Sequence, residues 1–90
     1  MKQLELRYVA HVTTLTDCLL ENYQTTASSL RELVAELDGV YPGFREMFEN
    51  PETRTLSLNA MIYYGAPDQV PISVIDLDQR IDGGATITFW

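Results

Sequence analysis

Residues 28–44 read SSLRELVAELDGVYPGF, and this stretch predicts the clearest helix of the chain. Ser29 stands three residues before Glu32, the spacing of a capping box, in which a serine side chain closes the first helical turn. Gly39 and the Pro42-Gly43 pair are expected to end the helix. The apolar residues between follow the i, i+3, i+4, i+7 rule and share one helix face: Leu30, Leu33, Val34 and Leu37.

That apolar face needs a partner layer, and the flanking sequence predicts a sheet. Alternating apolar and polar residues indicate strands over residues 3–12, 18–24, 56–64 and 85–90, with a further short strand at 72–75. A threonine-rich connection joins the first two strands, and residues 44–48 have the spacing of one or two helical turns. The expected order is β-β-α-turns-β-β. It favours an α+β domain in which one main helix packs on one face of a mixed sheet of four to five strands, with the first and last strands central.

Length and composition limit the kind of protein this is. Ninety residues suit a single domain, residues 1–90. Cys18 is the only cysteine, which favours a reducing compartment, and no apolar run is long enough to span a membrane. The N-terminal residues mix charge into every apolar stretch and do not resemble a signal peptide. We therefore expect a cytoplasmic location.

The charge balance narrows the choice of partner. Thirteen acidic residues against six basic ones give a net charge of −7, which disfavours nucleic acid and anionic membranes. A basic patch on a partner protein is the natural complement of such a surface. The alternative is that the charge only keeps a small protein in solution.

No group of residues has the pattern of a catalytic, metal or cofactor site. His11 is the only histidine and has no other metal-ligating residue at a suitable spacing. Cys18 has no basic neighbour in sequence to activate it, and the serines and threonines lack a base. Asp76, Asp78 and Asp82 lie close together but do not form a calcium-binding pattern. We expect no catalysis by the chain itself, no cofactor and no metal.

One group of residues points instead to a binding surface. If the alternation is right, Val9, Met61, Tyr63 and Trp90 lie on the sheet face opposite the helix, with Tyr64 nearby. Aromatic residues and methionine are enriched at protein interfaces, so these four are candidate partner-binding residues. Loops that cover them, or side chains turned into the core, are the alternative.

Four phrases in a fixed order resemble the MoaD/ThiS family of ubiquitin-like β-grasp proteins, which includes the small subunit of molybdopterin synthase. They are LELRYVAHVTTLTD (residues 4–17), TASSLRELVAEL running into YPGFREMF (26–48), LSLNAMIYY (56–64) and DLDQRIDGGATITF (76–89). Together they cover nearly the whole sequence. The resemblance implies the β-grasp fold and a role in molybdenum-cofactor or related sulfur transfer.

By this resemblance, the reactive part of such a protein is a flexible tail that ends in Gly-Gly. An E1-like adenylyltransferase activates the tail, sulfur transfer gives a thiocarboxylate, and a large synthase subunit uses it. The present sequence departs from the family at that place, because Trp90 follows Phe89 where the family continues to its diglycine. No tail residue can therefore be carried over, and carrier chemistry is expected only if a native tail is missing from this chain.

Gly83-Gly84 does not replace that tail in our interpretation. Asp82-Gly83-Gly84 has the composition of a tight turn, and removing residues 85–90 would delete a strand whose Ala85, Ile87 and Phe89 are expected to be buried. The sequence thus predicts a MoaD/ThiS-like protein that acts by binding a larger partner. The alternative is a β-grasp binding or regulatory subunit of an unrelated enzyme complex, without carrier chemistry.

Overall fold

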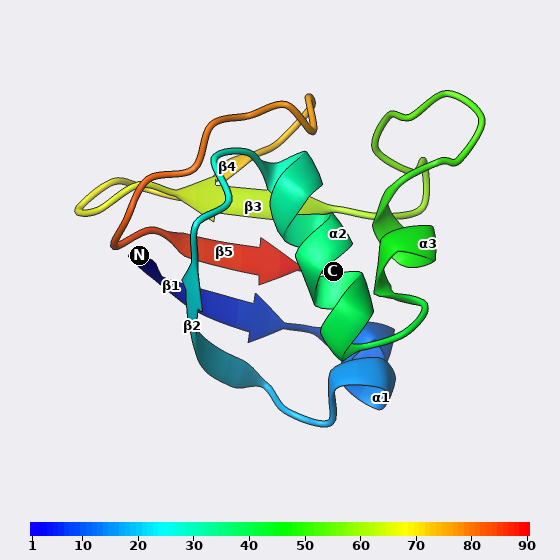
Figure 1. Ribbon diagram of the computed structural model, residues 1–90, viewed down its shortest axis with the longest axis horizontal. Helices are drawn as coiled ribbons and strands as arrows, with labels where there is room; N and C mark the ends of the chain where they lie inside the picture. Colours follow the sequence, from blue (N-terminus) through cyan, green and yellow to red (C-terminus); the bar gives the residue numbers. More distant parts are fainter.

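The centre of the sheet is built from the two ends of the chain. The computed structural model describes residues 1–90, and its strands lie in the order β2-β1-β5-β3-β4 (Figure 1). β1 and β5 run parallel, and the pairs β1–β2, β3–β5 and β3–β4 are antiparallel. The strands are β1 (Lys2–Tyr8), β2 (Leu20–Thr25), β3 (Ile62–Gly65), β4 (Ile72–Ser73) and β5 (Thr86–Phe89). The prediction of a mixed α+β sheet with its first and last strands central is confirmed.

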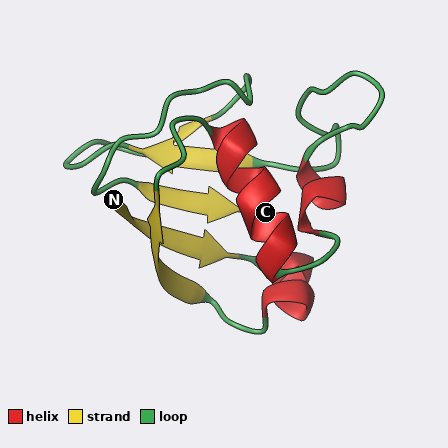
Figure 2. Ribbon diagram, viewed as in Figure 1, coloured by secondary structure: helices red, strands yellow, loops and turns green.

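The helices pack on one side of this sheet and near its strand ends. They are the 3-10 turn η1 (Ala10–Val12), α1 (Thr13–Thr16), α2 (Leu30–Val40) and α3 (Phe44–Phe48). α2 lies across one sheet face, whereas α1 and α3 lie close to the ends of β1 and β5 (Figures 1 and 2). None of these helices has the length and apolar character needed to cross a membrane.

α2 begins as the capping box predicts. Ser29 has an extended backbone (φ −137°), and its side chain accepts a hydrogen bond from the Glu32 backbone N–H at 3.3 Å. The Glu32 carboxylate accepts hydrogen bonds from the hydroxyls of Ser28 at 2.7 Å and Ser29 at 3.5 Å, instead of from the Ser29 backbone N–H that a full capping box uses. The predicted stop at Gly39 is wrong, because the helix continues through it and ends where Tyr41 leaves helical geometry.

The helix stripe and the strands enclose an aromatic core. Leu30, Leu33, Val34 and Leu37 are fully buried, and burial of each such side chain stabilises the fold by about 1.5–3 kcal/mol. Phe89, at the end of β5, stacks on Tyr8 with ring centroids 5.9 Å apart. The rings of Phe44 and Phe48 stand edge-on to it at 5.0 and 5.2 Å. The last strand is therefore packed into the middle of the protein.

The first strand is shorter than its alternation predicts. β1 ends at Tyr8, because Ala10 adopts a positive φ of 56° that breaks the extended backbone. The Thr13 hydroxyl then donates to the Ala10 carbonyl, and the threonine-rich segment forms η1 and α1 instead of a plain connection. Val12 and Thr16 are buried there and close one end of the core.

The predicted strand over residues 56–64 is largely wrong. Only Ile62–Gly65 pairs as β3, whereas Leu56 forms an isolated bridge with Glu49. The Leu58 side chain is 99% exposed, and the Ala60 N–H donates to the Ser57 carbonyl across a turn. Residues 56–60 therefore alternate between apolar and polar types although they do not pair in the sheet. The other strands shift by one or two residues from their predicted bounds: β2 is 20–25 rather than 18–24, β4 is 72–73 rather than 72–75, and β5 is 86–89 rather than 85–90.

Gly83-Gly84 forms the predicted turn. Gly84 has φ +85° and its N–H donates to the Gln3 carbonyl at 2.7 Å. The Ala85 N–H closes the turn on the Asp82 carbonyl, and Ala85 itself is fully buried. The diglycine therefore leads into the central strand, and cutting the chain after Gly84 would remove that strand.

The two glycines of this turn differ in their tolerance of a side chain. A Cβ on Gly84 would lie 3.1 Å from the Pro67 Cγ and require an unfavourable positive φ, whereas a Cβ on Gly83 would make an ordinary contact with Lys2 at 3.8 Å. We expect Gly84→Ala to lower the free energy of unfolding by about 1–2 kcal/mol. Gly83→Ala, the matched control, should change it by less than about 0.5 kcal/mol. Urea denaturation measures both, and equal effects would contradict the assigned turn.

Candidate functional site

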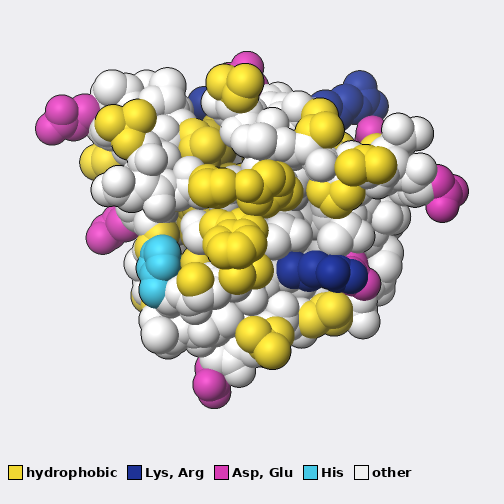
Figure 3. All heavy atoms as spheres, turned by 180° about the vertical axis from the view of Figure 1, so that it is seen from behind, with side chains coloured by type: hydrophobic (Ala, Val, Ile, Leu, Met, Phe, Trp, Pro, Cys, Tyr) yellow, Lys and Arg dark blue, Asp and Glu magenta, His cyan; other side chains and the backbone are white.

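The sheet face opposite α2 carries a cluster of apolar side chains. Met61 and Trp90 exchange backbone hydrogen bonds (2.9 and 3.5 Å), so their side chains stand opposite each other on the same face. The Val9 N–H donates to the Phe89 carbonyl at 3.0 Å, which continues the β1–β5 ladder and brings Val9 beside Trp90. Figure 3 views this side of the molecule and shows apolar side chains gathered in its middle.

The structure brings together all four residues that the sequence indicated: Val9, Met61, Tyr63 and Trp90. Tyr63 pairs with Thr88 of β5. It is two residues after Met61, so its side chain lies on the same face of the sheet. Met61 and Trp90 are 45% and 42% exposed, and Val9 and Tyr63 are half-buried. We call this cluster the open-face patch. Tyr64, noted as a neighbour, instead points into the core, where its hydroxyl accepts a hydrogen bond from the Asp82 N–H.

The surroundings of the open-face patch carry little net charge. Arg7 and Glu5 alternate with the buried residues of β1 and pair with each other at 2.7 Å. Thr86 and Thr88 of β5 face the same side. The whole chain has a net charge of −7, whereas this face presents apolar groups beside one neutral ion pair and Asp68, which lines a hollow with Arg7, Thr86 and Thr88. Such a composition is typical of a surface that associates with another protein.

Leu20 belongs to this face, although the sequence did not indicate it. It pairs with Arg7 across the β1–β2 ladder and is 49% exposed. Leu19 and Leu20 are adjacent apolar residues, so alternation alone did not show which of them lies on the sheet face opposite α2. His11 is exposed in η1, and Cys18 is half-buried between α1 and β2.

Two tyrosine–glutamate groups lie on the helix side of β2. The hydroxyls of Tyr8 and Tyr41 both donate to Glu21, at 2.8 and 2.9 Å. Burial, and then the hydrogen bond to Glu21, raise the pKa of both phenols well above the usual value. The Tyr23 hydroxyl donates to Glu36, and burial with this bond raises the pKa of Tyr23 to about 12. These phenols remain protonated at neutral pH and serve as hydrogen-bond donors.

The largest group of opposite charges surrounds one buried carboxylate. Glu49 at the end of α3 is 2% exposed in its side chain and bonds to Arg31 (3.2 Å), Arg45 (3.3 Å) and Arg54. Burial alone raises its pKa, but the hydrogen bonds and charges of Arg54 and Arg45 outweigh burial and hold the pKa below its ordinary value of 4.5. Arg31 also bonds to Asp78. The cluster therefore ties α2, α3 and two loops together.

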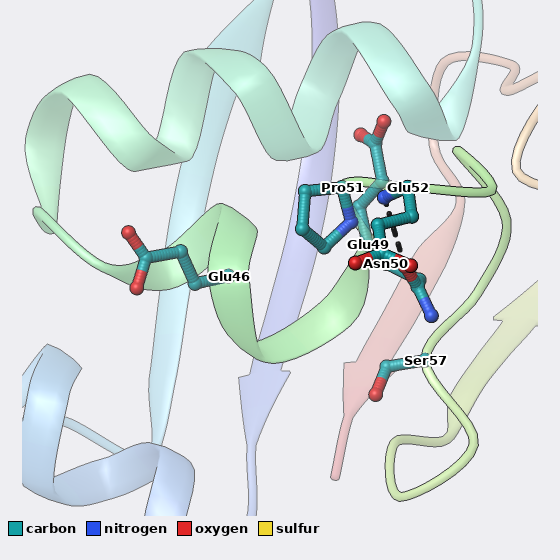
Figure 4. Close-up of a pocket in the computed structure, with 6 residues that line it drawn as sticks. All are labelled: Glu46, Glu49, Asn50, Pro51, Glu52 and Ser57. Carbon is teal, nitrogen blue, oxygen red and sulfur yellow. Dashed lines mark hydrogen bonds between the residues drawn. The ribbon is translucent and has the colours of Figure 1, made fainter.

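A shallow hollow beside this cluster does not form a cation site. Its volume is about 290 Å³, and it is lined by Glu46, Glu49, Asn50, Pro51, Glu52 and Ser57. In Figure 4 the Glu46 carboxylate points away from the others, and no three carboxylate, histidine or cysteine groups converge on one point. The glutamates of the hollow thus do not share a ligand position, and the Glu49 carboxylate is already paired with arginines.

The architecture and its neighbours among solved structures define the class of fold. A five-stranded mixed sheet with parallel central strands from the two chain ends, crossed by one main helix, is the ubiquitin-like β-grasp fold. The expected fold is therefore confirmed. No protein-family model matches this sequence, and no curated protein matches it.

Three solved structures show the likeness in detail. The Haloferax volcanii HVO 2177 protein superposes with TM-score 0.77 at 11% identity, over 98% of this chain and 80% of its own. SAMP1 from the same organism, a small archaeal modifier protein, gives 0.74 at 9% identity, over 98% and 92%. A protein described as molybdopterin converting factor subunit 1, from Pyrococcus furiosus, gives 0.69 at 13% identity, over 99% and 95%. At these identities the likeness establishes a MoaD-like, ubiquitin-like fold.

The arginine cluster generates a prediction about stability and pH. Because the pKa of Glu49 is lowered in the folded protein, its contribution is complete above pH 4.5 and is lost as the pH falls through the lowered value. We expect Glu49→Gln to lower the free energy of unfolding by about 1–3 kcal/mol at pH 7. The difference from the unmodified protein should shrink as the pH falls below 4.5.

Urea denaturation between pH 7 and pH 3 checks this expectation. Glu46→Gln is the matched control, since Glu46 is exposed on the same helix and takes part in no ion pair. A Glu49→Gln difference that stays constant across this pH range would contradict the role given to the carboxylate.

Proposed function

We propose that this chain is a MoaD/ThiS-like small protein that acts in the cytoplasm by binding a larger protein through the open-face patch. The observation that carries the proposal is the juxtaposition of Val9, Met61, Tyr63 and Trp90 on an uncovered face of low charge. The β-grasp fold adds support, because the solved structures with this fold include a modifier protein and a molybdopterin converting factor subunit. The chain itself performs no catalysis, and its partner supplies the chemistry.

The system we propose is molybdenum-cofactor synthesis or a related sulfur-transfer pathway. The partner is then an E1-like adenylyltransferase or a large synthase subunit, both of which are enzymes that act on a carrier. Carrier chemistry requires a chain with a free terminal Gly-Gly. Glycine has no Cβ, so a tail of glycines can enter the narrow channel that leads to a partner's active site. Gly83-Gly84 does not meet this requirement, since it lies in the turn before β5.

The position of that turn favours a second candidate, a β-grasp subunit that binds or regulates an enzyme complex without carrying sulfur. Intact-mass spectrometry of the protein from its native host separates the two. A species extended to Gly-Gly that gains about 16 Da with the sulfur-transfer enzymes, from replacement of a carboxylate oxygen by sulfur, supports the carrier. A species ending at Trp90 with no such gain supports the non-carrier subunit.

The open-face patch is tested by mutation and binding. Trp90→Ala removes the largest exposed side chain of the patch, while its backbone bonds to Met61 remain available. If the patch is the interface, we expect the affinity for the adenylyltransferase or the synthase subunit of the same organism to fall about tenfold or more, as at an interface hot spot. Isothermal titration calorimetry measures this change.

Leu58→Ser provides the matched control for this experiment. Leu58 is the most exposed large apolar side chain apart from the patch, and it lies in a loop outside the sheet. Its replacement should change the affinity by less than about twofold. Equal losses for Trp90→Ala and Leu58→Ser, or no loss with Trp90→Ala, would contradict a role of the open-face patch in binding.

A further inference from the structure

The two edges of the sheet differ in how well they are protected from further strand pairing. β4 has two residues and follows Pro71, which has no N–H to donate. β2, at the other edge, has six residues, LENYQT, and contains neither proline nor lysine, the residues that usually protect an edge. All six pair with β1 on one side, and no strand pairs with them on the other (Figure 1).

The phase of the β1–β2 ladder shows which backbone groups are free. The Tyr8 N–H donates to the Leu19 carbonyl at 3.0 Å, so residues 19, 21, 23 and 25 direct their backbone groups toward β1. By the alternation of an antiparallel ladder, Leu20, Asn22 and Gln24 direct their N–H and C=O groups away from the sheet. An extended segment in antiparallel or parallel orientation can pair with these groups.

The charges beside this edge are negative and have no positive partner in the chain. Glu21 accepts hydrogen bonds from Tyr8 and Tyr41, and neither donor is a cation. Glu36 reaches from α2 over β2, where Tyr23 and Thr25 donate to it at 2.9 Å. Neither glutamate takes part in a salt bridge.

The lysine and the five arginines of the chain all bond to groups other than Glu21 and Glu36. The Lys2 amino group donates to two backbone carbonyls. Each of the five arginines forms a salt bridge with a carboxylate other than Glu21 or Glu36: Arg7, Arg31, Arg45, Arg54 and Arg80. The edge therefore combines free backbone groups with carboxylates that lack a cation.

We propose that the β2 edge binds an extended, basic segment of a partner protein by β-strand addition. The backbone of that segment pairs with Leu20, Asn22 and Gln24, and its lysine or arginine side chains on the helix side lie against Glu21 and Glu36. Its alternate side chains face the other side of the sheet, beside Leu20. The site is separate from the open-face patch and does not depend on the function proposed above.

The proposal is tested with a short capped peptide of alternating valine and lysine, titrated into the ¹⁵N-labelled protein and followed by NMR. We expect the peptide to shift the amide signals of Leu20, Asn22 and Gln24 and their neighbours. Two control peptides should not: one with glutamate in place of lysine, and one N-methylated so that its outward N–H groups are removed. The first control tests charge, and the second tests backbone pairing.

Two protein variants sharpen the test. Glu36→Gln keeps a hydrogen-bond acceptor but removes the charge, and should weaken the lysine peptide roughly twofold to fivefold, as expected for an exposed ion pair. Glu46→Gln, an exposed glutamate on α3, is its matched control and should have no effect. Asn22→Pro removes an N–H on the free side only and should abolish the shifts; the N-methylated peptide gives the same information if this variant does not fold.

Three results would overturn the proposal. Equal affinity for the lysine and glutamate peptides would show that the carboxylates of the β2 edge do not determine binding. Shifts confined to Trp90, Met61 and Tyr63 would place the peptide on the open-face patch instead. Shifts of the β2 amides that grow with protein concentration in the absence of peptide would show that a second copy of the chain occupies the edge.

Discussion

The parallel ladder between β1 and β5 is the contact on which the rest of the structure depends. It joins Glu5 to Thr86 and Tyr8 to Phe89, and so brings the two ends of the chain side by side. The hairpin partner β2 is attached on one side of this ladder, and β3 on the other. Phe89 carries the aromatic core from the ladder to α3. The open-face patch also depends on the ladder, because it places Val9 beside Trp90.

The sequence predicted those features that local patterns determine and missed those that distant contacts determine. The α2 stripe, its Ser29 cap and the β5 alternation each depend on residues a few positions apart, and all three were recovered. Residues 56–60 alternate as a strand does, but the Glu49 bridge to Leu56 and the arginines around Glu49 organise this region as a loop. The ion pairs of Arg31 and Arg54 with Glu49 join residues 18 and 5 positions apart, at no repeating interval, so no periodicity in the sequence predicts them. The common face of the four patch residues was predictable because each lies in a paired strand or one residue beyond its end, where alternation still determines the face.

The surface is divided between two kinds of recognition. The open sheet face offers apolar side chains beside one neutral ion pair, so its affinity would come from burying surface and would vary little with salt. The β2 edge offers backbone groups and carboxylates, so its affinity would come from hydrogen bonds and charge. Neither surface has an arginine except the paired Arg7, since three of the other four surround Glu49 and Arg80 pairs with Asp82. Because these arginines pair with other carboxylates of the chain, Glu21 and Glu36 at the β2 edge have no arginine partner.

The central position of β5 also bears on how the chain acquires its fold during synthesis. β1 is translated first, yet its partner β5 lies near the other end of the sequence, so the hairpin of β1 and β2 must wait with one side of β1 unpaired. Closing such a long loop costs entropy before any contact compensates for it, and folds with many distant pairings form slowly. While the ribosome still holds the last strand, the apolar side of β1 and the α2 stripe have no complete sheet to cover them. These apolar residues are thus fully covered only after β5 has joined the sheet.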